Sequence, residues 1–275
     1  DELLEALDRQ LAATADEDEA LGAELHTEAS RLCLLVPGRA EEAVSRAEAA
    51  LKLDPAHGSA RFQLAAASAA VGDFEGSGAA LEELGRRLRA ERSAAPEKRA
   101  FLGNVYRELA EVYAERLSDP ARARKAWRTA AASLEGEPLA RVLERWSRAA
   151  SGETEWAEAA EVQEWLRGLR SEARDALALS EAYEHLGRLD DALRALRDAP
   201  PPEDAPEDAP GALARELRDR ERALLSAAGR SGELARSLEE EARRAELPSR
   251  RHALLLEAAE HYLELYRRIM EGKRV

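Results

Sequence analysis

The side chains that come nearest to a metal-ligand pattern lie close together late in the chain. They are Glu257, Glu260, His261 and Glu264, and their spacing places all four on one face of a helix. A metal site in a helical bundle also requires ligands from a second helix, and the sequence offers no matching group. A charged face in contact with water is therefore the favoured interpretation, and no metal is predicted.

Motifs for nucleophilic or cofactor chemistry do not emerge either. Cys33 is the single cysteine and lies among leucines with no evident base, so it is predicted to pack as a small hydrophobe. The chain contains no glycine-rich phosphate-binding motif, no His-Glu-x-x-His and no Gly-x-Ser-x-Gly. We therefore predict a protein that is not an enzyme and holds no cofactor.

The elements that carry these side chains are predicted to be helices. Alanine, leucine, glutamate and arginine dominate the 275 residues and aromatic residues make up 4%, while β-branched residues are too scarce for any strand. The 55 acidic and 41 basic residues give a net charge of -14, which offers no broad positive field for nucleic acid. No apolar run approaches the roughly 20 residues that span a bilayer, so no membrane insertion is predicted.

A repeated pattern of about 34 residues organises the helices. In its clearest occurrence a first helix carries Leu179 and Tyr183, Gly187 lies at the turn, and a second helix carries Ala192 and Leu196. Glycine supplies the backbone freedom for the turn, and small residues let two antiparallel helices approach closely. Other turns depart from this pattern. At Ser118-Asp119-Pro120 there is no glycine, and we expect Asp119 to cap the helix that Pro120 begins.

This spacing resembles the tetratricopeptide repeat (TPR). The motif from Leu179 to Ala199 matches the family, and Ala50 to Pro55 matches its closing segment. The resemblance implies an all-α fold of antiparallel helix pairs, stacked as a right-handed TPR-like superhelix. An irregular helical repeat of the HEAT type is the alternative, although it lacks the fixed glycine and alanine spacing. The repeat register between residues 138 and 170 stays open.

An acidic, proline-rich segment interrupts the predicted array. Residues 1–199 are predicted to form a TPR-like helical array, 200–211 an acidic Pro-rich loop or linker, and 212–275 further TPR-like helices whose last repeat is incomplete. The proline-rich segment is either a solvated loop or a hinge. The incomplete last repeat suggests a fragment of a longer array.

Four tryptophans lie in the middle third of the chain: Trp127, Trp146, Trp156 and Trp165. We predict that large rings fill space that the small residues leave open, and that Trp156 and Trp165 are the more exposed pair. An exposed tryptophan in the groove is alternatively an anchor for a partner.

Binding of another protein or peptide is the predicted function. In the resembling family the first helix of each unit lines a concave face, and carrying this over by position predicts the partner-binding residues. They are Arg107, Glu108, Glu111, Glu115, Glu181, Glu184, His185, Arg222 and Ser226. Such long, charged side chains suit a polar or basic segment. A structural spacer or oligomerisation segment of a larger assembly is the alternative, and an enzyme with a site in the helical groove is a more distant one.

A broad apolar face marks the last predicted helix. It comprises Leu254, Leu255, Ala258, Ala259, Tyr262, Leu265 and Ile269. The sequence contains no following helix to cover this face, so we expect a further repeat or self-association to do so. A cytoplasmic location is preferred, and a periplasmic or secreted one stays open because the sequence begins at Asp1 and not at methionine.

Overall fold

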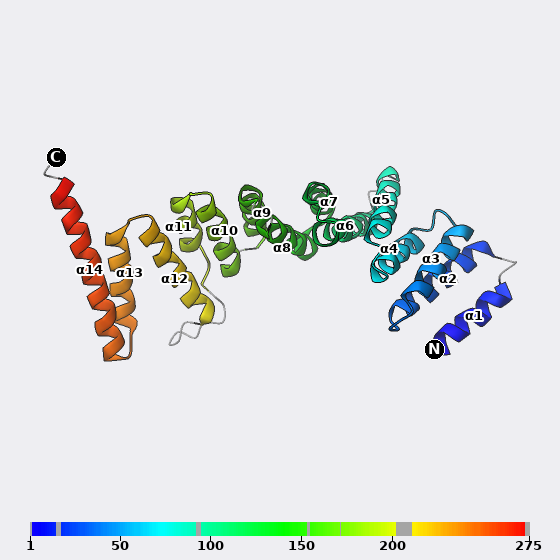
Figure 1. Ribbon diagram of the computed structural model, residues 1–275, viewed down its shortest axis with the longest axis horizontal. Coiled ribbons are helices and arrows are strands. Elements are labelled where there is room, and N and C mark those ends of the chain that lie inside the picture. Colours follow the sequence, from blue (N-terminus) through cyan, green and yellow to red (C-terminus); the bar gives the residue numbers. More distant parts are fainter. Residues whose placement is uncertain are drawn as a thin grey trace. The chain divides into compact units, whose positions relative to one another are not determined.

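The computed structural model describes residues 2–14, 18–91, 95–152, 155–170, 172–201 and 211–272. These residues form helices and turns without any strand (Figure 1). In chain order the elements are α1 (Glu2–Thr14), α2 (Glu19–Leu34), α3 (Ala40–Leu53), α4 (Gly58–Ala70), α5 (Phe74–Ala90), α6 (Pro96–Glu111), the π-helical turn η1 (Val112–Arg116), α7 (Pro120–Ser133), α8 (Gly136–Gly152), α9 (Trp156–Leu169), α10 (Ala173–His185), α11 (Leu189–Arg197), α12 (Ala212–Ala227), α13 (Ser231–Arg244) and α14 (Pro248–Gly272). The predicted all-α fold is confirmed.

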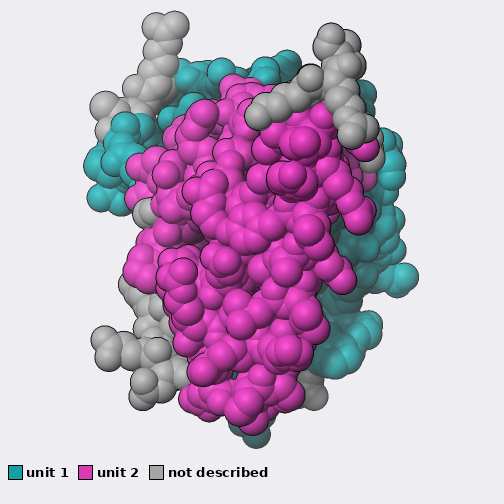
Figure 2. Space-filling model, turned by 90° about the vertical axis from the view of Figure 1, so that its left-hand side faces the viewer, with its two compact units in different colours: residues 1–146 teal, residues 147–275 magenta. Residues whose placement is uncertain are grey.

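The chain divides into two compact units, residues 1–146 and 147–275, which Figure 2 colours separately. The division falls within α8. Residues 202–210, which make up most of the predicted Pro-rich linker, lie outside the described part of the chain. A hinge there therefore stays a prediction.

Helices that follow one another in sequence pack as pairs inside each unit. In the first unit α2 packs on α3, α4 on α5 and α6 on α7, and in the second unit α10 packs on α11 and α12 on α13. Each pair is joined by a short turn, the arrangement of an antiparallel helical hairpin. The predicted helix-pair repeat is thus present in both units, with α6, α10 and α12 as first helices and α7, α11 and α13 as second helices.

The turns within the pairs depend on a left-handed residue. Gly187 has a φ of 71° between α10 and α11, and at the turn before α7 Ser118 takes the corresponding conformation with a φ of 50°. Asp119 accepts a hydrogen bond from the Arg122 amide at 2.9 Å, and Pro120 begins α7. The predicted cap and first helical residue are confirmed. In the turn without glycine, Ser118 therefore takes the strained left-handed conformation, and the Asp119 cap and Pro120 stabilise the start of the next helix.

Small residues allow the paired helices to approach closely. In the second unit Ala192 is fully buried and lies in one cluster with Leu179, Tyr183 and Leu193. In the first unit a Cβ atom added to Gly103 of α6 would lie 2.5 Å from Cγ of Leu134. Both contacts leave no space for a larger side chain, so the alternation of small and large residues determines how the helices pack.

The four tryptophans and Cys33 are buried or exposed as the sequence predicted. Trp127 and Trp146 are buried, Trp156 is half-buried and Trp165 is 43% exposed, so the more exposed pair was predicted correctly. Cys33 is buried, and burial raises the pKa of its thiol, which disfavours the reactive thiolate.

Enlarging the residue at the closest helix approach tests the assigned register. We expect Ala192→Leu to lower the free energy of unfolding by about 1–3 kcal/mol, because a fully buried alanine between packed helices cannot be enlarged without strain. Ala157→Leu on the exposed face of α9 is the matched control and should change stability by no more than about 0.5 kcal/mol. Equal effects of the two substitutions in urea denaturation would contradict this packing.

Candidate functional site

The residues predicted to bind a partner all lie on first helices, but in two separate units. Arg107, Glu108 and Glu111 lie on α6 and Glu115 on η1, all in the first unit. The second unit contains Glu181, Glu184 and His185 on α10 and Arg222 and Ser226 on α12. We therefore describe two surfaces, each formed by the first helices of one unit.

Glu111 is the centre of the surface in the first unit. Its carboxylate lies 3.7 Å from a guanidinium nitrogen of Arg107 and forms an ion pair with Arg145 on α8, one repeat further along the chain. Arg107 also contacts Glu108 at 2.5 Å. Burial and the nearby Glu108 raise the pKa of Glu111, although the two arginines act in the opposite direction. Glu111 thus links two successive first helices, while Glu115 stays exposed.

Glu184 has the same role in the second unit. It forms an ion pair with Arg220 of α12, which again joins the first helices of successive pairs. Glu181, one turn before Glu184, is exposed. In both units an acid of one first helix therefore forms an ion pair with the next first helix, and a neighbouring acid remains exposed.

A hollow of about 540 Å³ runs along α12 on the same surface. It is lined by Ala212, Arg215, Glu216, Asp219, Arg220 and Ala223. This spacing of three and four residues defines one helix face, and it continues to the exposed Ser226. Our sequence reasoning missed Arg215, Glu216 and Asp219. The same spacing, counted back from Ser226, was the signal that could have identified them.

Two of the predicted residues are already engaged in contacts within the chain. The ring of His185 stacks on Trp156 with 3.8 Å between the ring centroids and 8° between the planes. Arg222 is mostly buried and forms an ion pair with Glu241, which also contacts Arg250 at 2.7 Å. These contacts within the chain fix the orientation of both side chains.

A tyrosine connects each of two first helices to the preceding second helix. The Tyr113 hydroxyl donates to Glu82 of α5 at 2.5 Å, and the Tyr183 hydroxyl donates to Glu164 of α9. An arginine lies over each ring, Arg122 at 5.4 Å and Arg188 at 4.4 Å. Burial, followed by the carboxylate partner, raises the pKa of each tyrosine to about 12. Both rings are thus structural and stay protonated at neutral pH.

The surroundings of the two tyrosines differ in charge. Around Tyr113 lies a pocket of about 530 Å³, lined by Glu82, Arg86, Arg89, Tyr106, Leu109, Tyr113, Arg122, Lys125, Ala126 and Thr129. Around Tyr183, in contrast, Asp191 pairs with both Arg188 and Arg194. The surroundings of Tyr113 are therefore more basic than those of Tyr183. Tyr106 and Leu109 lie on a different face of α6 from Arg107 and Glu111, so the pocket is separate from the surface that carries these two charged residues.

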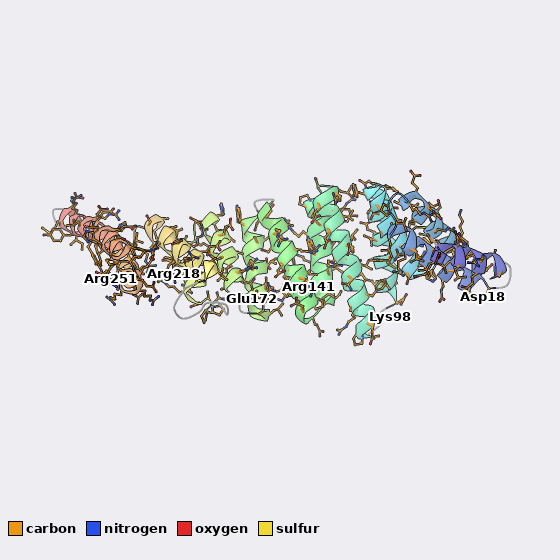
Figure 3. All side chains as sticks on the ribbon, turned by 90° about the horizontal axis from the view of Figure 1, so that it is seen from below. Asp18, Lys98, Arg141, Glu172, Arg218 and Arg251 are labelled. Atoms are coloured by element: carbon orange, nitrogen blue, oxygen red, sulfur yellow. The ribbon has the colours of Figure 1, made fainter. Side chains whose placement is uncertain are left out.

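Charged side chains project from helices along the whole chain (Figure 3). Many form exposed pairs, such as Lys98 with Glu91 at 2.8 Å and Arg141 with Glu137 at 3.0 Å. Exposed pairs of this kind contribute roughly 0–1 kcal/mol each.

Among the described residues no group of three or more histidine, cysteine, aspartate or glutamate side chains lies close enough to hold a metal ion. Glu264 instead pairs with Arg268 and lies 3.9 Å from His261. No described helix has both the length and the apolar character needed to cross a membrane.

Comparison with solved structures identifies the class of fold. No protein-family model and no curated protein sequence matches the chain. The structure of YrrB, described as a TPR protein with an unusual peptide-binding site, is 15% identical over 82% of this chain and 98% of its own, with a TM-score of 0.53. A structure of Naa15/Naa10 bound to HypK-THB is 16% identical over 91% of this chain and 35% of its own, with a TM-score of 0.60.

These similarities show a TPR-like helical-repeat fold. The predicted resemblance to tetratricopeptide repeats is therefore confirmed at the level of the fold. At such identities the similarity carries no partner or activity from either structure to this chain.

The raised pKa of Glu111 predicts how its contribution to stability varies with pH. A carboxyl whose pKa is higher in the folded than in the unfolded state favours folding at low pH, and this contribution is lost as the pH rises through the folded pKa. The Glu111→Gln variant lacks this loss. We therefore expect its free energy of unfolding, relative to that of the unsubstituted chain, to increase from about pH 4 to about pH 7. Urea denaturation at the two pH values measures this. A difference that is constant or falls with pH would contradict the assignment.

Proposed function

We propose that this chain is a non-catalytic scaffold that binds a polar, basic segment of another protein on its first-helix surface. The observation that carries the proposal is the hollow along α12, where Glu216 and Asp219 are exposed beside Arg220. Arg220 is tied to Glu184, and Glu181 lies exposed one turn away. Glu181 and Glu216 are thus open carboxylates of this surface, whereas Asp219 lies 3.9 Å from Arg222. The hollow is also lined by the exposed Arg215.

The chemistry of this surface favours recognition over catalysis. Its acids are paired with arginines or open to water, and among the described residues none is coupled to a nucleophile that it could activate. Open carboxylates on helices held in place by ion pairs select a partner by charge and register. A segment with spaced lysine or arginine side chains meets both requirements. The TPR-like fold supports this use, because stacked helix pairs present extended binding surfaces.

The surface in the first unit extends the proposal. There Glu115 is exposed, whereas Glu108 and Glu111 each contact Arg107. Because that surface has fewer open acids, we place the stronger contribution on the second unit. The proposal involves neither nucleic acid nor membrane insertion, in keeping with the net charge of -14, and the cytoplasmic location stays a prediction.

A structural spacer is the second candidate function. The long exposed face of α14 favours it, because a chain that joins other subunits needs such a surface. The two functions differ in one observable. A scaffold with an acidic groove binds a basic segment in a salt-dependent way, and a spacer does not.

Reversing the open charges of the second unit tests the binding surface. We expect Glu181→Lys combined with Glu216→Lys to weaken binding of a basic peptide by about tenfold or more, because the change places like charges in contact. Fluorescence anisotropy with labelled basic, neutral and acidic peptides of equal length measures this. The basic peptide should bind best to the unsubstituted chain.

A second double substitution provides the control. Glu161→Lys combined with Glu240→Lys alters the charge equally, at exposed positions on the second helices α9 and α13. It should leave peptide affinity unchanged, and both double variants should keep their thermal midpoints. If peptide charge has no effect, or if the control weakens binding as much, the groove assignment is wrong. Glu111 and Glu184 are unsuitable for reversal because each holds two helices together.

A further inference from the structure

The pocket around Tyr113 in the first unit has a basic rim. Its volume is about 530 Å³, and α5, α6 and α7 line it, with α6 packed on both of the others (Figure 1). Two cations of α5, two of α7 and one acid stand at its rim, all of them exposed: Arg86, Arg89, Arg122, Lys125 and Glu82. This local excess of positive charge is opposite in sign to the net charge of the chain, -14.

The sequences of α5 and α7 maintain this excess. The helix α7 contains four basic residues and no acidic one: Arg122, Arg124, Lys125 and Arg128. The end of α5, from Gly85 to Ala90, contains three arginines and no acid. Because both helices lack carboxylates where they meet the pocket, its cations are not all neutralised from within the chain.

Two of the four cations have a carboxylate partner. Arg86 pairs with Glu83, and Arg122 lies 3.3 Å from Asp119, in each case an acid three residues earlier. Glu82 is the acid among the described residues that line the pocket, and it accepts the hydrogen bond of the Tyr113 hydroxyl at 2.5 Å. These contacts leave the other two cations to a ligand.

Those two cations, Arg89 and Lys125, form no ion pair with a described residue. The guanidinium carbon of Arg89 lies 5.9 Å from the centroid of the Tyr106 ring, a cation–π contact that leaves its N–H groups available. Arg89 comes from α5 and Lys125 from α7, and both line the same pocket. Two available cations can neutralise a dianion, whereas one carboxylate would satisfy only one of them.

An aromatic wall stands beside these cations. The Tyr106 ring packs on Gly85 of α5, where an added Cβ atom would lie 2.9 Å from Cζ of the ring. Tyr106 is half-buried, and the buried Leu109 and Ala126 line the same pocket. The volume falls within the roughly 300–1,000 Å³ of small-ligand sites. The pocket is therefore suited to an anion that is attached to an apolar body.

We infer that this pocket binds a phosphate monoester carried on an aromatic or apolar group. A phosphate monoester has close to two negative charges at neutral pH, which matches Arg89 and Lys125. Its oxygens also accept the paired N–H groups of a guanidinium, while the attached group lies against Tyr106 and Leu109. The site takes the opposite charge from the acidic groove of the second unit, so the inference does not rest on the proposed function.

Phenyl phosphate tests this chemistry without any peptide sequence. At low ionic strength we expect a dissociation constant in the roughly millimolar range or below, measured from amide chemical shifts in NMR titrations. The shifted amides should lie in α5, α6 and α7. Inorganic phosphate lacks the ring and benzoate lacks the second charge, so each should bind at least about threefold more weakly.

Substitutions at the rim test which side chains hold the phosphate. Arg89→Ala and Lys125→Ala should each raise the dissociation constant about tenfold, because each removes a charge-assisted contact. Lys125→Arg keeps the charge and should retain most of the affinity. Arg128→Ala is the matched control, since it removes an exposed cation from a different face of α7 and should leave binding unchanged. All four variants should keep their thermal midpoints.

Two comparisons define the ligand and separate this inference from the proposed function. A phosphorylated side chain of a protein and a phosphorylated small molecule share the same chemistry. Tighter binding of a phosphotyrosine peptide than of free phosphotyrosine would support the first source, and the reverse order would support the second. Phenyl phosphate should bind unchanged to the Glu181→Lys, Glu216→Lys variant, because both substitutions lie in the second unit.

Three results would overturn the inference. Absence of phenyl phosphate binding up to about 10 mM would exclude the site. Equal affinities of Arg89→Ala, Lys125→Ala and the Arg128→Ala control would place the binding elsewhere. Inorganic phosphate or benzoate that binds as tightly as phenyl phosphate would show that the pocket does not recognise a phosphate monoester.

Discussion

The close approach of paired helices is the constraint on which this structure depends. A single helix of this composition cannot bury its apolar stripe alone, and a pair can do so only if small residues occupy the contact. Ala192 in the second unit and Gly103 in the first meet this requirement, since neither site has space for a larger side chain. Because each first helix is held by its partner on one side, its opposite side remains free. The candidate binding surface follows from that geometry and needs no additional element.

The charges on the free side serve two different purposes. One acid of each surface, Glu111 or Glu184, is used to tie successive first helices together through Arg145 or Arg220. Exposed neighbours such as Glu181 have no comparable structural contact. Partly exposed ion pairs add little free energy, so their value lies in fixing the spacing of the helices. In the proposed function, the open carboxylates on these helices select a partner segment with matching charges.

Sequence reasoning recovered the elements whose positions depend on local chemistry. The turn at Gly187 and the capped start at Asp119 and Pro120 follow from residue type alone, and both agree with the structure. The pairing of Glu111 with Arg145 could not be predicted, because it depends on how far two long side chains reach between successive repeats. The hollow on α12 was missed for a related reason. The repeat pattern is weak around residues 212–223, and it predicted Arg222 as the binding residue there, whereas the structure packs Arg222 against Glu241.

The exposed apolar face of α14 follows from the same reasoning about free faces. In a stacked array every helix with two apolar faces needs two neighbours, and α14 has one among the described residues. A second copy and a further helix of a longer array would both use the side that carries Tyr262 and Leu263.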